Sequence, residues 1–414
     1  MQDKNVLIIT DLFPPSFAPR MGYLAKYLAG HSWKGTAIAP LYESEQKVFG
    51  LLSGYINTKR IVISKQDEQK KYKRSTIQKA LSLFFPDLES TWRLNREMIQ
   101  QCKELIKNEH VDIILCSTYR LFPLNIACKI AKMYDIPWIA DLRDIYEQYP
   151  VKWSFLMELY KKSGIRRRNI FLKKANAITV VSKRHTELLS RYKLKTQVIY
   201  NGFDSDLFFP STFHQLDKFR IVYTGMIFSK SGVGRDPSPL FSAIQKLHNN
   251  GEIDPQNCRI QFYTNSKSQE IVNRSAEKHD VLDFIDCFEY VSFSEVPKIL
   301  ADSSVLLLLL QGRNTGIMTT KFFEYLGVQR PVLCVWGDDG EIMEIMNHSN
   351  AGLAAKTEEE IQQFVKMKYD EWMETGYTNS GIDWNYVKQF SRKDQAKQFV
   401  DIFDSVLKQF NKKT

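Results

Sequence analysis

Lys321 and Glu324 are the two residues whose types and spacing most directly suggest chemistry. They lie three positions apart at the start of an expected helix over residues 320–327, so both side chains would share one face of that helix. A cation and a carboxylate beside the free amides of a helix N-terminus can bind a phosphate group and a pair of hydroxyls. The same pattern is also typical of a solvated ion pair on an ordinary helix, which contributes little to stability.

The elements before this pair indicate a ligand-binding edge of a sheet. The apolar run 305–310 predicts a buried strand, and the loop 311–319 joins that strand to the helix. Ligands of open parallel sheets bind beyond the carboxyl ends of the strands, where such a loop lies. A nucleotide-sugar, which carries a diphosphate and several hydroxyls, would engage both charged side chains.

Apolar runs alternate with amphipathic stretches along the whole chain, and the alternation restarts once near its middle. The strands expected before the restart are 6–10, 36–39, 113–116, 138–140, 177–181 and 197–200. Those expected after it are 220–225, 259–263, 284–288, 305–310, 331–335 and 351–353. Alternation of strands and helices predicts parallel sheets covered on both faces. The expected fold class is therefore α/β, with two Rossmann-like, doubly wound domains that face each other across a cleft.

The restart also sets the expected domain limits. Residues 1–205 would form the first domain and residues 206–388 the second. Residues 389–414 predict a final helix, which could pack back on the first domain. A chain of 414 residues is long enough for two cores, since single cores rarely grow beyond about 250–300 residues.

The composition narrows the class of protein. Hydrophobic residues make up 43% of the chain and charged residues 25%, which favours an ordinary folded protein over a disordered one. The longest apolar run is far shorter than the roughly 20 residues that cross a bilayer, and the N-terminus lacks a signal-peptide pattern. None of the six cysteines forms a C-x-x-C pair, so we expect reduced thiols in a cytoplasmic protein, without disulfides or a zinc site.

Charge is distributed unevenly between the two halves. Residues 1–205 carry a net charge of +15 and residues 206–414 a net charge of −5. Anionic lipid, a lipid-diphosphate acceptor and nucleic acid are the candidate partners of the basic half, and a solvated surface without a partner is the alternative. The run Lys70–Arg74 precedes apolar residues at helical spacing, which is typical of a helix on a membrane surface. A peripheral position on the inner face of the cytoplasmic membrane is thus a second expected location.

Several motifs in sequence order resemble those of the retaining GT-B glycosyltransferases of family four, most closely the bacterial branch that builds surface polysaccharides such as capsule and lipopolysaccharide. They are Thr10–Pro15 with Arg20, Pro86 and Asp87 with Trp92, Ala140–Asp144, Val181–Ser182 with Val198–Asp204, Tyr223–Gly225, and Lys321–Tyr325. The resemblance covers nearly the whole chain. It implies the GT-B fold and the transfer of a sugar from a nucleotide-diphosphate sugar to an acceptor hydroxyl, with retention at the anomeric carbon. The acceptor would be a lipid-linked or polysaccharide intermediate of a cell-surface glycan.

The resemblance also implies a nucleotide-sugar site in the second domain. Its residues would be Gly225, Lys230, Arg235, Thr320, Lys321 and Glu324. Glu324 would accept hydrogen bonds from the ribose hydroxyls of the donor. Lys321, with the amides that lead into its helix, would bind the diphosphate. Arg235 would be a second cation for the phosphates, with Lys230 as its rival.

In the first domain, the resemblance implies that the loop 13–22 faces the donor and the acceptor. The acceptor-side residues of this loop would be Pro15, Arg20 and Gly22. Arg143 and Asp144 follow a strand end, where a residue of the cleft is expected, although they could instead form a structural salt bridge. The candidate catalytic residues are therefore Asp144, Arg143 and Lys321.

Three departures from the family pattern bear on activity. The family often has a glutamate eight residues before the position of Glu324, where this chain has Gly316. Many members have an arginine where this chain has Met226, and a histidine in the stretch that here reads Ser117–Arg120. No dedicated general base is therefore visible, and the donor phosphate could itself take the acceptor proton.

The expected reaction needs neither a cofactor nor a metal ion. A D-x-D sequence occurs at Asp204–Asp206, but it lies at the link between the domains and not in a cleft loop. The main alternatives are a catalytically inactive GT-B scaffold and a nucleotide-sugar 2-epimerase of the same fold. A dinucleotide-dependent oxidoreductase would need a G-x-G-x-x-G loop where this chain has Asp11–Pro15, and a nucleic-acid binder would need a recognisable motif. We therefore expect no nucleic-acid partner.

Overall fold

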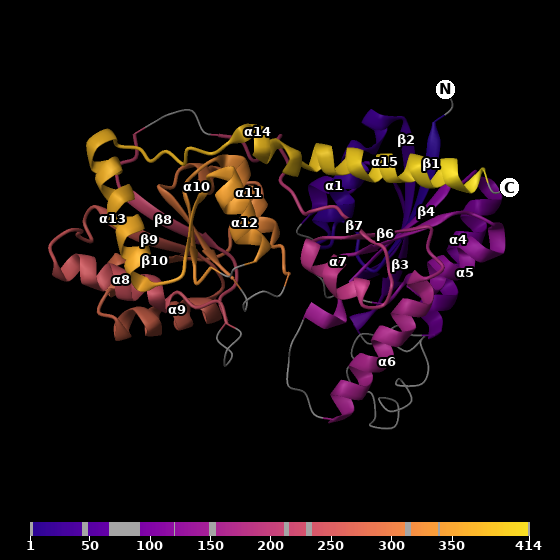
Figure 1. The fold of residues 1–414 in the computed structure, drawn as a ribbon, viewed down its shortest axis with the longest axis horizontal. Helices are drawn as coiled ribbons and strands as arrows, with labels where there is room; N and C mark the ends of the chain where they lie inside the picture. The colour runs from indigo at the N-terminus through magenta and orange to yellow at the C-terminus, as the bar shows by residue number, and fades with distance from the viewer. Residues whose placement is uncertain are drawn as a thin grey trace. The chain divides into compact units, whose positions relative to one another are not determined.

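The chain forms two compact units. Unit 1 comprises Met1–Tyr200 and Arg392–Thr414, and unit 2 comprises Asn201–Ser391 (Figure 1). The computed structural model describes residues 3–43, 49–65, 92–119, 121–148, 155–210, 215–228, 234–310, 316–337 and 340–412. The chain passes between the units twice, at the peptide bond before Asn201 and at the one before Arg392.

Unit 1 is built on a seven-stranded parallel sheet with the order β3-β2-β1-β4-β5-β6-β7. Its strands are β1 (Lys4–Thr10), β2 (Trp33–Tyr42), β3 (Asn57–Ile63), β4 (Ile113–Thr118), β5 (Trp138–Leu142), β6 (Ala177–Val180) and β7 (Gln197–Val198). Its helices are α1 (Pro19–Leu28), α4 (Trp92–Asn108), α5 (Leu124–Tyr134), α6 (Phe155–Leu172), α7 (Lys183–Ser190) and α15 (Arg392–Phe410), with short turns η1 (Ala29–His31), η2 (Gly50–Leu52) and η4 (Tyr146–Gln148).

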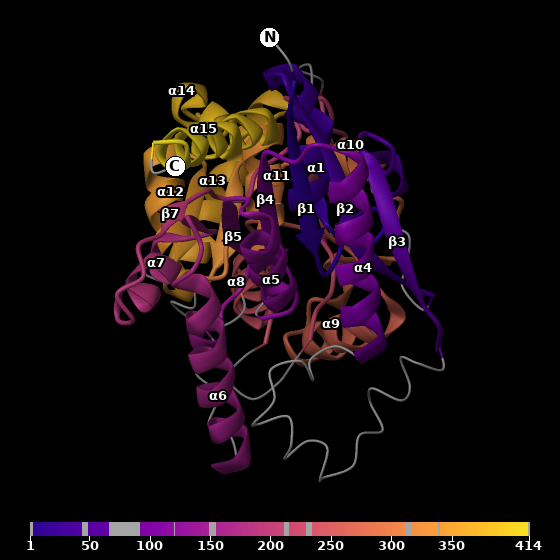
Figure 2. The same cartoon turned by 90° about the vertical axis from the view of Figure 1, so that its right-hand side faces the viewer.

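Both faces of this sheet are buried, because residues alternate between two cores along each strand. In β1, Leu7 and Ile9 belong to the core that includes α4 and α5, whereas Val6 and Ile8 belong to the core that includes α1 and α15. The C-terminal helix α15 packs on unit 1 through its apolar face, with the ring of Phe403 5.1 Å from that of Trp33. Helix α6 extends away from the sheet (Figure 2).

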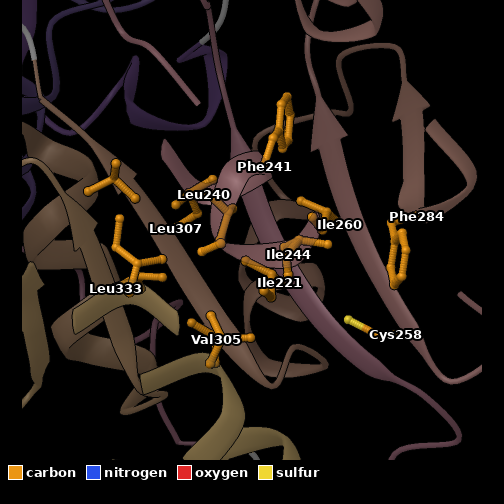
Figure 3. Packing of buried hydrophobic residues seen from close by; sticks show 14 of the residues in the cluster. Ile221, Leu240, Phe241, Ile244, Cys258, Ile260, Phe284, Val305, Leu307 and Leu333 are labelled. Atoms are coloured by element: carbon orange, nitrogen blue, oxygen red, sulfur yellow. The ribbon is translucent and has the colours of Figure 1, made fainter. Parts of the chain in front are cut away.

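Unit 2 repeats the design with six parallel strands in the order β10-β9-β8-β11-β12-β13. Its strands are β8 (Phe219–Thr224), β9 (Cys258–Tyr263), β10 (Ile285–Phe288), β11 (Val305–Leu309), β12 (Val332–Val335) and β13 (Gly352–Ala355). Its helices are α8 (Ser238–Asn249), α9 (Ser266–Lys278), α10 (Val296–Ala301), α11 (Thr320–Val328), α12 (Glu341–Ser349), α13 (Glu358–Thr375) and α14 (Trp384–Val387), with short turns η5 (Leu282–Phe284) and η6 (Lys388–Phe390). Figure 3 shows one face of its core, where side chains of α8 and the central strands pack together.

The structure confirms the predicted fold class of two Rossmann-like parallel-sheet domains. The sequence analysis did not predict strand β3, helix α13 and the short helix α14. Strand β3 lies at the edge of its sheet, where only alternate residues are buried, so its apolar pattern is weak. Among the described residues, no helix has both the length and the apolar composition that a membrane span requires.

Candidate functional site

The strand order of unit 2 reverses at β8 and β11, which are neighbours in the sheet. Chain connections leave these two strands in opposite directions, so a crevice opens beyond their carboxyl ends. Gly225 follows β8 directly, and residues 316–319 lead into the N-terminus of α11 after β11. Gly225, Thr320, Lys321 and Glu324, which were predicted to bind the nucleotide-sugar, lie in or next to these two segments.

Lys321 lies in the first turn of α11 and reaches across to the end of β8. Its Nζ donates a hydrogen bond to Oη of Tyr223 at 3.3 Å and lies 4.4 Å from the centre of that ring. Gly225 has a φ of +118°, and a Cβ at this position would overlap Nζ of Lys321. Glycine is therefore required here both by the backbone conformation and by the approach of the lysine.

Arg235 supplies a second cation beside the same tyrosine. Its Nη1 donates to the carbonyl oxygen of Met226 at 3.0 Å, and its guanidinium lies 5.5 Å from the centre of the Phe228 ring. Oη of Tyr223 donates to the same Met226 carbonyl at 3.0 Å. Within the described part of the chain, neither Lys321 nor Arg235 forms an ion pair. Two positive charges are thus held near each other by neutral oxygens.

The pKa of Lys321 lies far below the usual value for a lysine side chain. Burial and the neighbouring charge of Arg235 lower the pKa of Lys321 to about 7, while Glu324 acts in the opposite direction. Burial raises the pKa of Tyr223 to about 12, so its hydroxyl stays protonated at neutral pH. An anion placed between the two cations would offset their repulsion and return Lys321 to its charged form.

The N-terminus of α11 adds backbone donors to these cations. Its N-cap residue, Thr319, has an extended backbone and makes no capping hydrogen bond with its side chain. The first-turn amides therefore have no side-chain cap, as in helix N-termini that bind phosphate. Thr320 and Glu324 are both partly buried on this short helix, with Glu324 one turn beyond the N-terminus.

The loop before α11 accounts for one departure from the family pattern. Gly316 has a φ of +72°, in the left-handed region that residues with a side chain rarely adopt. The missing glutamate thus coincides with a backbone turn that favours glycine. Met226 is 51% exposed at the end of β8, and its carbonyl is already used by Arg235 and Tyr223. Lys230, the predicted rival of Arg235, lies outside the described residues, as do Lys70–Arg74, Pro86 and Asp87.

In unit 1, Arg20 and Asp141 form a buried ion pair at the end of β5. Arg20 donates through Nε and Nη2 to both carboxylate oxygens, at 2.8–3.2 Å, and its side chain is only 3% exposed. Ser117 and Thr179 donate to the same carboxylate at 2.8 and 2.7 Å. The pKa of Asp141 is lowered because Arg20 and these hydrogen bonds outweigh the burial that would raise it. These contacts favour a structural role for Arg20, which was predicted on the acceptor side.

Arg143 and Asp144 lie just beyond β5, at the edge where they were predicted. Arg143 does not pair with Asp144 but forms a salt bridge through Nη2 with Asp11, which follows β1. Burial raises the pKa of Asp11, although the charge of Arg143 opposes this. Asp144 instead accepts a hydrogen bond from Nε2 of Gln148, in the turn that follows. Asp11, which sequence reasoning did not select, is thus the partner of Arg143 at this edge.

Pro15 and Gly22 shape the loop rather than present functional groups. A Cβ at Gly22, within α1, would lie 2.6 Å from Cγ of Pro14, so the glycine allows close packing of the helix against the loop. Pro15 accepts a hydrogen bond from the amide of Phe49 at 3.0 Å. The Phe17 side chain is 57% exposed, in contrast to its mostly buried neighbours.

The sequence analysis did not identify the contacts of two unit 2 residues, Tyr223 and Asn201. Nδ2 of Asn201 donates a hydrogen bond to the carbonyl oxygen of Met318 at 2.8 Å. Tyr223 contacts Lys321 and, through the Met226 carbonyl, shares a partner with Arg235. The signal in the sequence was the Y-x-G motif, which marks the position but not the contact. Asp204, in the D-x-D sequence, is 1% exposed and accepts a hydrogen bond from the amide of Asp206 at 3.3 Å. It therefore organises a turn.

Part of the chain is similar to a known family. Residues 60–207 match the model of Glycosyltransferase Family 4. A comparison of the sequence with curated proteins found no match.

The fold is shared with solved structures over almost the whole chain. A glycosyltransferase from Rickettsia africae aligns at 16% identity with a TM-score of 0.66, over 99% of this chain and 100% of that one. HepE from Anabaena, solved with UDP-glucose, aligns at 12% identity with a TM-score of 0.62, over 97% and 99%. A proposed UDP-N-acetylglucosamine 2-epimerase from Listeria monocytogenes aligns at 12% identity with a TM-score of 0.53, over 97% and 95%. Similarity at these identities establishes the GT-B fold.

Proposed function

We propose that this GT-B protein is a glycosyltransferase that moves a sugar from a nucleotide-diphosphate sugar to an acceptor hydroxyl. The observation that carries the proposal is the pair of cations, Lys321 and Arg235, beside the α11 N-terminus at the switch point of unit 2. Both cations contact neutral oxygens, and their mutual repulsion favours a bound anion. The match to Glycosyltransferase Family 4 and the bound UDP-glucose of HepE support a nucleotide-sugar as that anion.

The chemistry follows from where charge develops. The bond between the anomeric carbon and the diphosphate oxygen breaks, and the leaving diphosphate gains negative charge. Lys321, Arg235 and the first amides of α11 would stabilise that charge, and each well-placed donor can lower the barrier by roughly 3–4 kcal/mol. Glu324, one turn into the helix, is suited to accept hydrogen bonds from the ribose hydroxyls.

Retention at the anomeric carbon is part of the proposal and rests on the motif resemblance. The acceptor oxygen would bond to the anomeric carbon on the face that the leaving group departs, and the acceptor proton would pass to a diphosphate oxygen. The reaction then balances without a protein base, a cofactor or a metal ion. We expect undiminished transfer in excess chelator, and a product with the donor's anomeric configuration by NMR. Loss of transfer in chelator would overturn the metal-independent mechanism.

We place the acceptor at the basic first half of the chain, as a lipid-linked or polysaccharide intermediate of surface-glycan synthesis. The net charge of +15 over residues 1–205 favours an anionic acceptor or an anionic membrane surface. Pelleting with liposomes should show binding to anionic vesicles at low salt, weaker binding at high salt, and none to neutral vesicles. No binding to anionic vesicles at low salt would remove the membrane from the proposal.

The decisive experiment is thermal-shift binding with UDP, GDP, ADP, TDP and CMP, with NAD as a control. A ligand at about 100 times its dissociation constant adds roughly 2.7 kcal/mol of stability, which is readily measured. We expect one nucleoside diphosphate to stabilise the protein and to lose affinity in Glu324→Ala. A protein that none of the nucleotides stabilises would instead be a scaffold with the GT-B fold.

A nucleotide-sugar 2-epimerase is the second candidate, because a proposed enzyme of that kind shares the fold. The two reactions differ in their need for an acceptor. A transferase that is incubated without an acceptor should leave the nucleotide-sugar intact. The nucleotide-sugar used is the one built on the nucleoside diphosphate that stabilises the protein. Conversion to a second nucleotide-sugar under these conditions would establish the epimerase instead.

A further inference from the structure

The first residues of unit 2, Asn201–Phe203, run along α11 and contact both of its ends. At the N-terminal end, Nδ2 of Asn201 donates a hydrogen bond of 2.8 Å to the carbonyl oxygen of Met318. At the C-terminal end, Phe203 packs so closely on Gly327 that a Cβ there would lie 2.7 Å from its ring. This segment, part of the motif Val198–Asp204 at the start of unit 2, therefore contacts both ends of the helix that carries Lys321.

The hydrogen bond from Asn201 acts on the turn that leads into α11, because its acceptor is the carbonyl oxygen of Met318. Met318 is 4% exposed and lies two residues before Thr320, the first residue of α11. Its carbonyl orientation sets the peptide plane of the next residue, Thr319, whose side chain makes no cap. Because a carbonyl oxygen can only accept, the amide nitrogen of Asn201 is the group that fixes this turn.

The backbone of Asn201–Phe203 is itself held in place. The amide of Phe203 donates to the carbonyl oxygen of Phe390 at 3.1 Å, and a Cβ at Gly202 would overlap that same carbonyl. One residue earlier, within unit 1, the carbonyl of Tyr200 accepts hydrogen bonds from Arg20 and Gln395. Asn201 is thus a fixed point from which the turn before α11 can be oriented.

We infer that Asn201 is a positioning residue for the donor diphosphate. It holds the turn 316–319 so that the first amides of α11 and Nζ of Lys321 converge on one phosphate group. The inference rests on the proposed function and adds to it a residue that need not touch the substrate. Loss of this single hydrogen bond should weaken phosphate binding about tenfold, since such a bond is worth about one decade in affinity.

The test compares Asn201→Asp and Asn201→Ala with the wild-type protein. The aspartate keeps the size of the side chain but presents an oxygen to the Met318 carbonyl, and the alanine removes the contact. Asn250→Asp is the matched control, because Asn250 is exposed at the end of α8, where its Nδ2 donates to Glu252. Calorimetry would measure binding of the stabilising nucleoside diphosphate, of inorganic pyrophosphate, and of the same nucleoside without phosphates.

We expect both Asn201 variants to bind the diphosphate and pyrophosphate about tenfold more weakly, with nucleoside binding and the control unchanged. Hydrogen exchange in the free protein should be faster at the amide of Phe322, which donates to the carbonyl oxygen of Thr319 at 3.3 Å. Wild-type-like diphosphate affinity in both variants, or unchanged exchange, would overturn the inference while the proposed function stands. A wild-type protein that binds no nucleoside diphosphate would overturn both. If Asn201→Asp does not fold, Asn201→Ala gives the same comparison.

Discussion

The carboxyl edges of the two sheets use their charged residues in opposite ways. At the edge of unit 1, Arg20 pairs with Asp141 and Arg143 with Asp11, so each cation is matched by a carboxylate of the same unit. At the edge of unit 2, Lys321 and Arg235 contact only neutral oxygens among the bonds that their side chains form with described residues.

This difference suggests that the charged residues at the edge of unit 1 contribute to stability and that those at the edge of unit 2 bind a ligand. A buried, matched ion pair holds its own elements together, and its loss leaves an uncompensated charge. Lys321 and Arg235 repel each other, which together with burial lowers the pKa of Lys321, and a bound anion would relieve that repulsion. We therefore interpret this edge of unit 1 as a rigid frame, and we propose that the edge of unit 2 binds an anion.

The largest expected effect is on the stability of unit 1. Asp141→Ala should lower the free energy of unfolding by about 3–5 kcal/mol, because it leaves the guanidinium of Arg20 buried and unpaired. Denaturant unfolding would measure this loss. Glu97→Ala, which breaks the exposed pair of Arg93 and Glu97, is the control and should cost under about 0.5 kcal/mol. A similar, small loss in both variants would erase the contrast between the edges.

The same pair should make unit 1 sensitive to acid. The pKa of Asp141 in the folded protein lies below its ordinary value, so its stabilisation is complete at neutral pH. That stabilisation is lost as the pH falls through the folded pKa and the carboxylate takes up a proton. Unfolding measured from pH 7 downward should therefore show a steeper loss of stability in the wild type than in Asp141→Asn. Parallel curves would contradict this assignment.

The second effect should fall on function without loss of stability. Lys321→Met removes the charge but keeps an apolar stem over the Tyr223 ring. We expect kcat/KM to fall by about 10²–10³, in line with the loss of one charge-stabilising donor. Urea unfolding should show equal or greater stability, because burial disfavours the charged lysine. A variant that loses stability in proportion to activity would make Lys321 a structural residue.

The third effect is a pH dependence of nucleotide binding in unit 2. Free Lys321 loses its proton near pH 7, and a bound diphosphate should raise its pKa, so binding takes up a proton above that pH. The dissociation constant of the nucleoside diphosphate should therefore increase from pH 7 to pH 9, approaching tenfold per unit. In Lys321→Arg, whose side chain stays charged, the profile should be flat. A slope shared by both proteins would exclude Lys321 as its source.

The smallest effect should come from the turn before α11. Gly316→Ala should cost about 1 kcal/mol, because its φ of +72° strains a residue with a Cβ. Gly30→Ala is a suitable control, since a Cβ there meets no atom within 4 Å and needs no positive φ. Denaturant unfolding would give the free energy of unfolding of both variants, and calorimetry would give their nucleotide affinity. No difference between them would mean that Gly316 is not constrained by its backbone.

Much of unit 2's site could be predicted from the sequence because it is local. Lys321 and Glu324 share a helix, and a buried strand with a loop before that helix places them at the edge of a sheet. Hydrophobic periodicity identified the central strands for the same reason, since each reflects burial of a continuous segment. The sequence did not predict the edge strand β3, because only Ile61 and Ile63 of its seven residues are buried.

The contacts of unit 1 could not be read from the chain in the same way. Arg20 and Asp141 are 121 residues apart in the sequence. Nothing in the sequence distinguishes them from other oppositely charged pairs that make no contact. A loop motif suggested an acceptor-side role for Arg20, and only the folded unit brings the first turn of α1 within hydrogen-bonding distance of the Asp141 carboxylate. Arg143 likewise meets Asp11 and not its neighbour Asp144.

By itself the sequence determined the two parallel-sheet domains and the helix that presents Lys321 and Glu324, because strand, loop and helix signals are encoded in contiguous residues. Tertiary structure alone decided which charges are paired, since ion pairs depend on which strand ends become neighbours in the sheet. It also decided that Asn201, at the crossing between units, contacts the turn before α11. Short-range patterns fix the elements, and the order of the strands fixes which side chains meet at their ends.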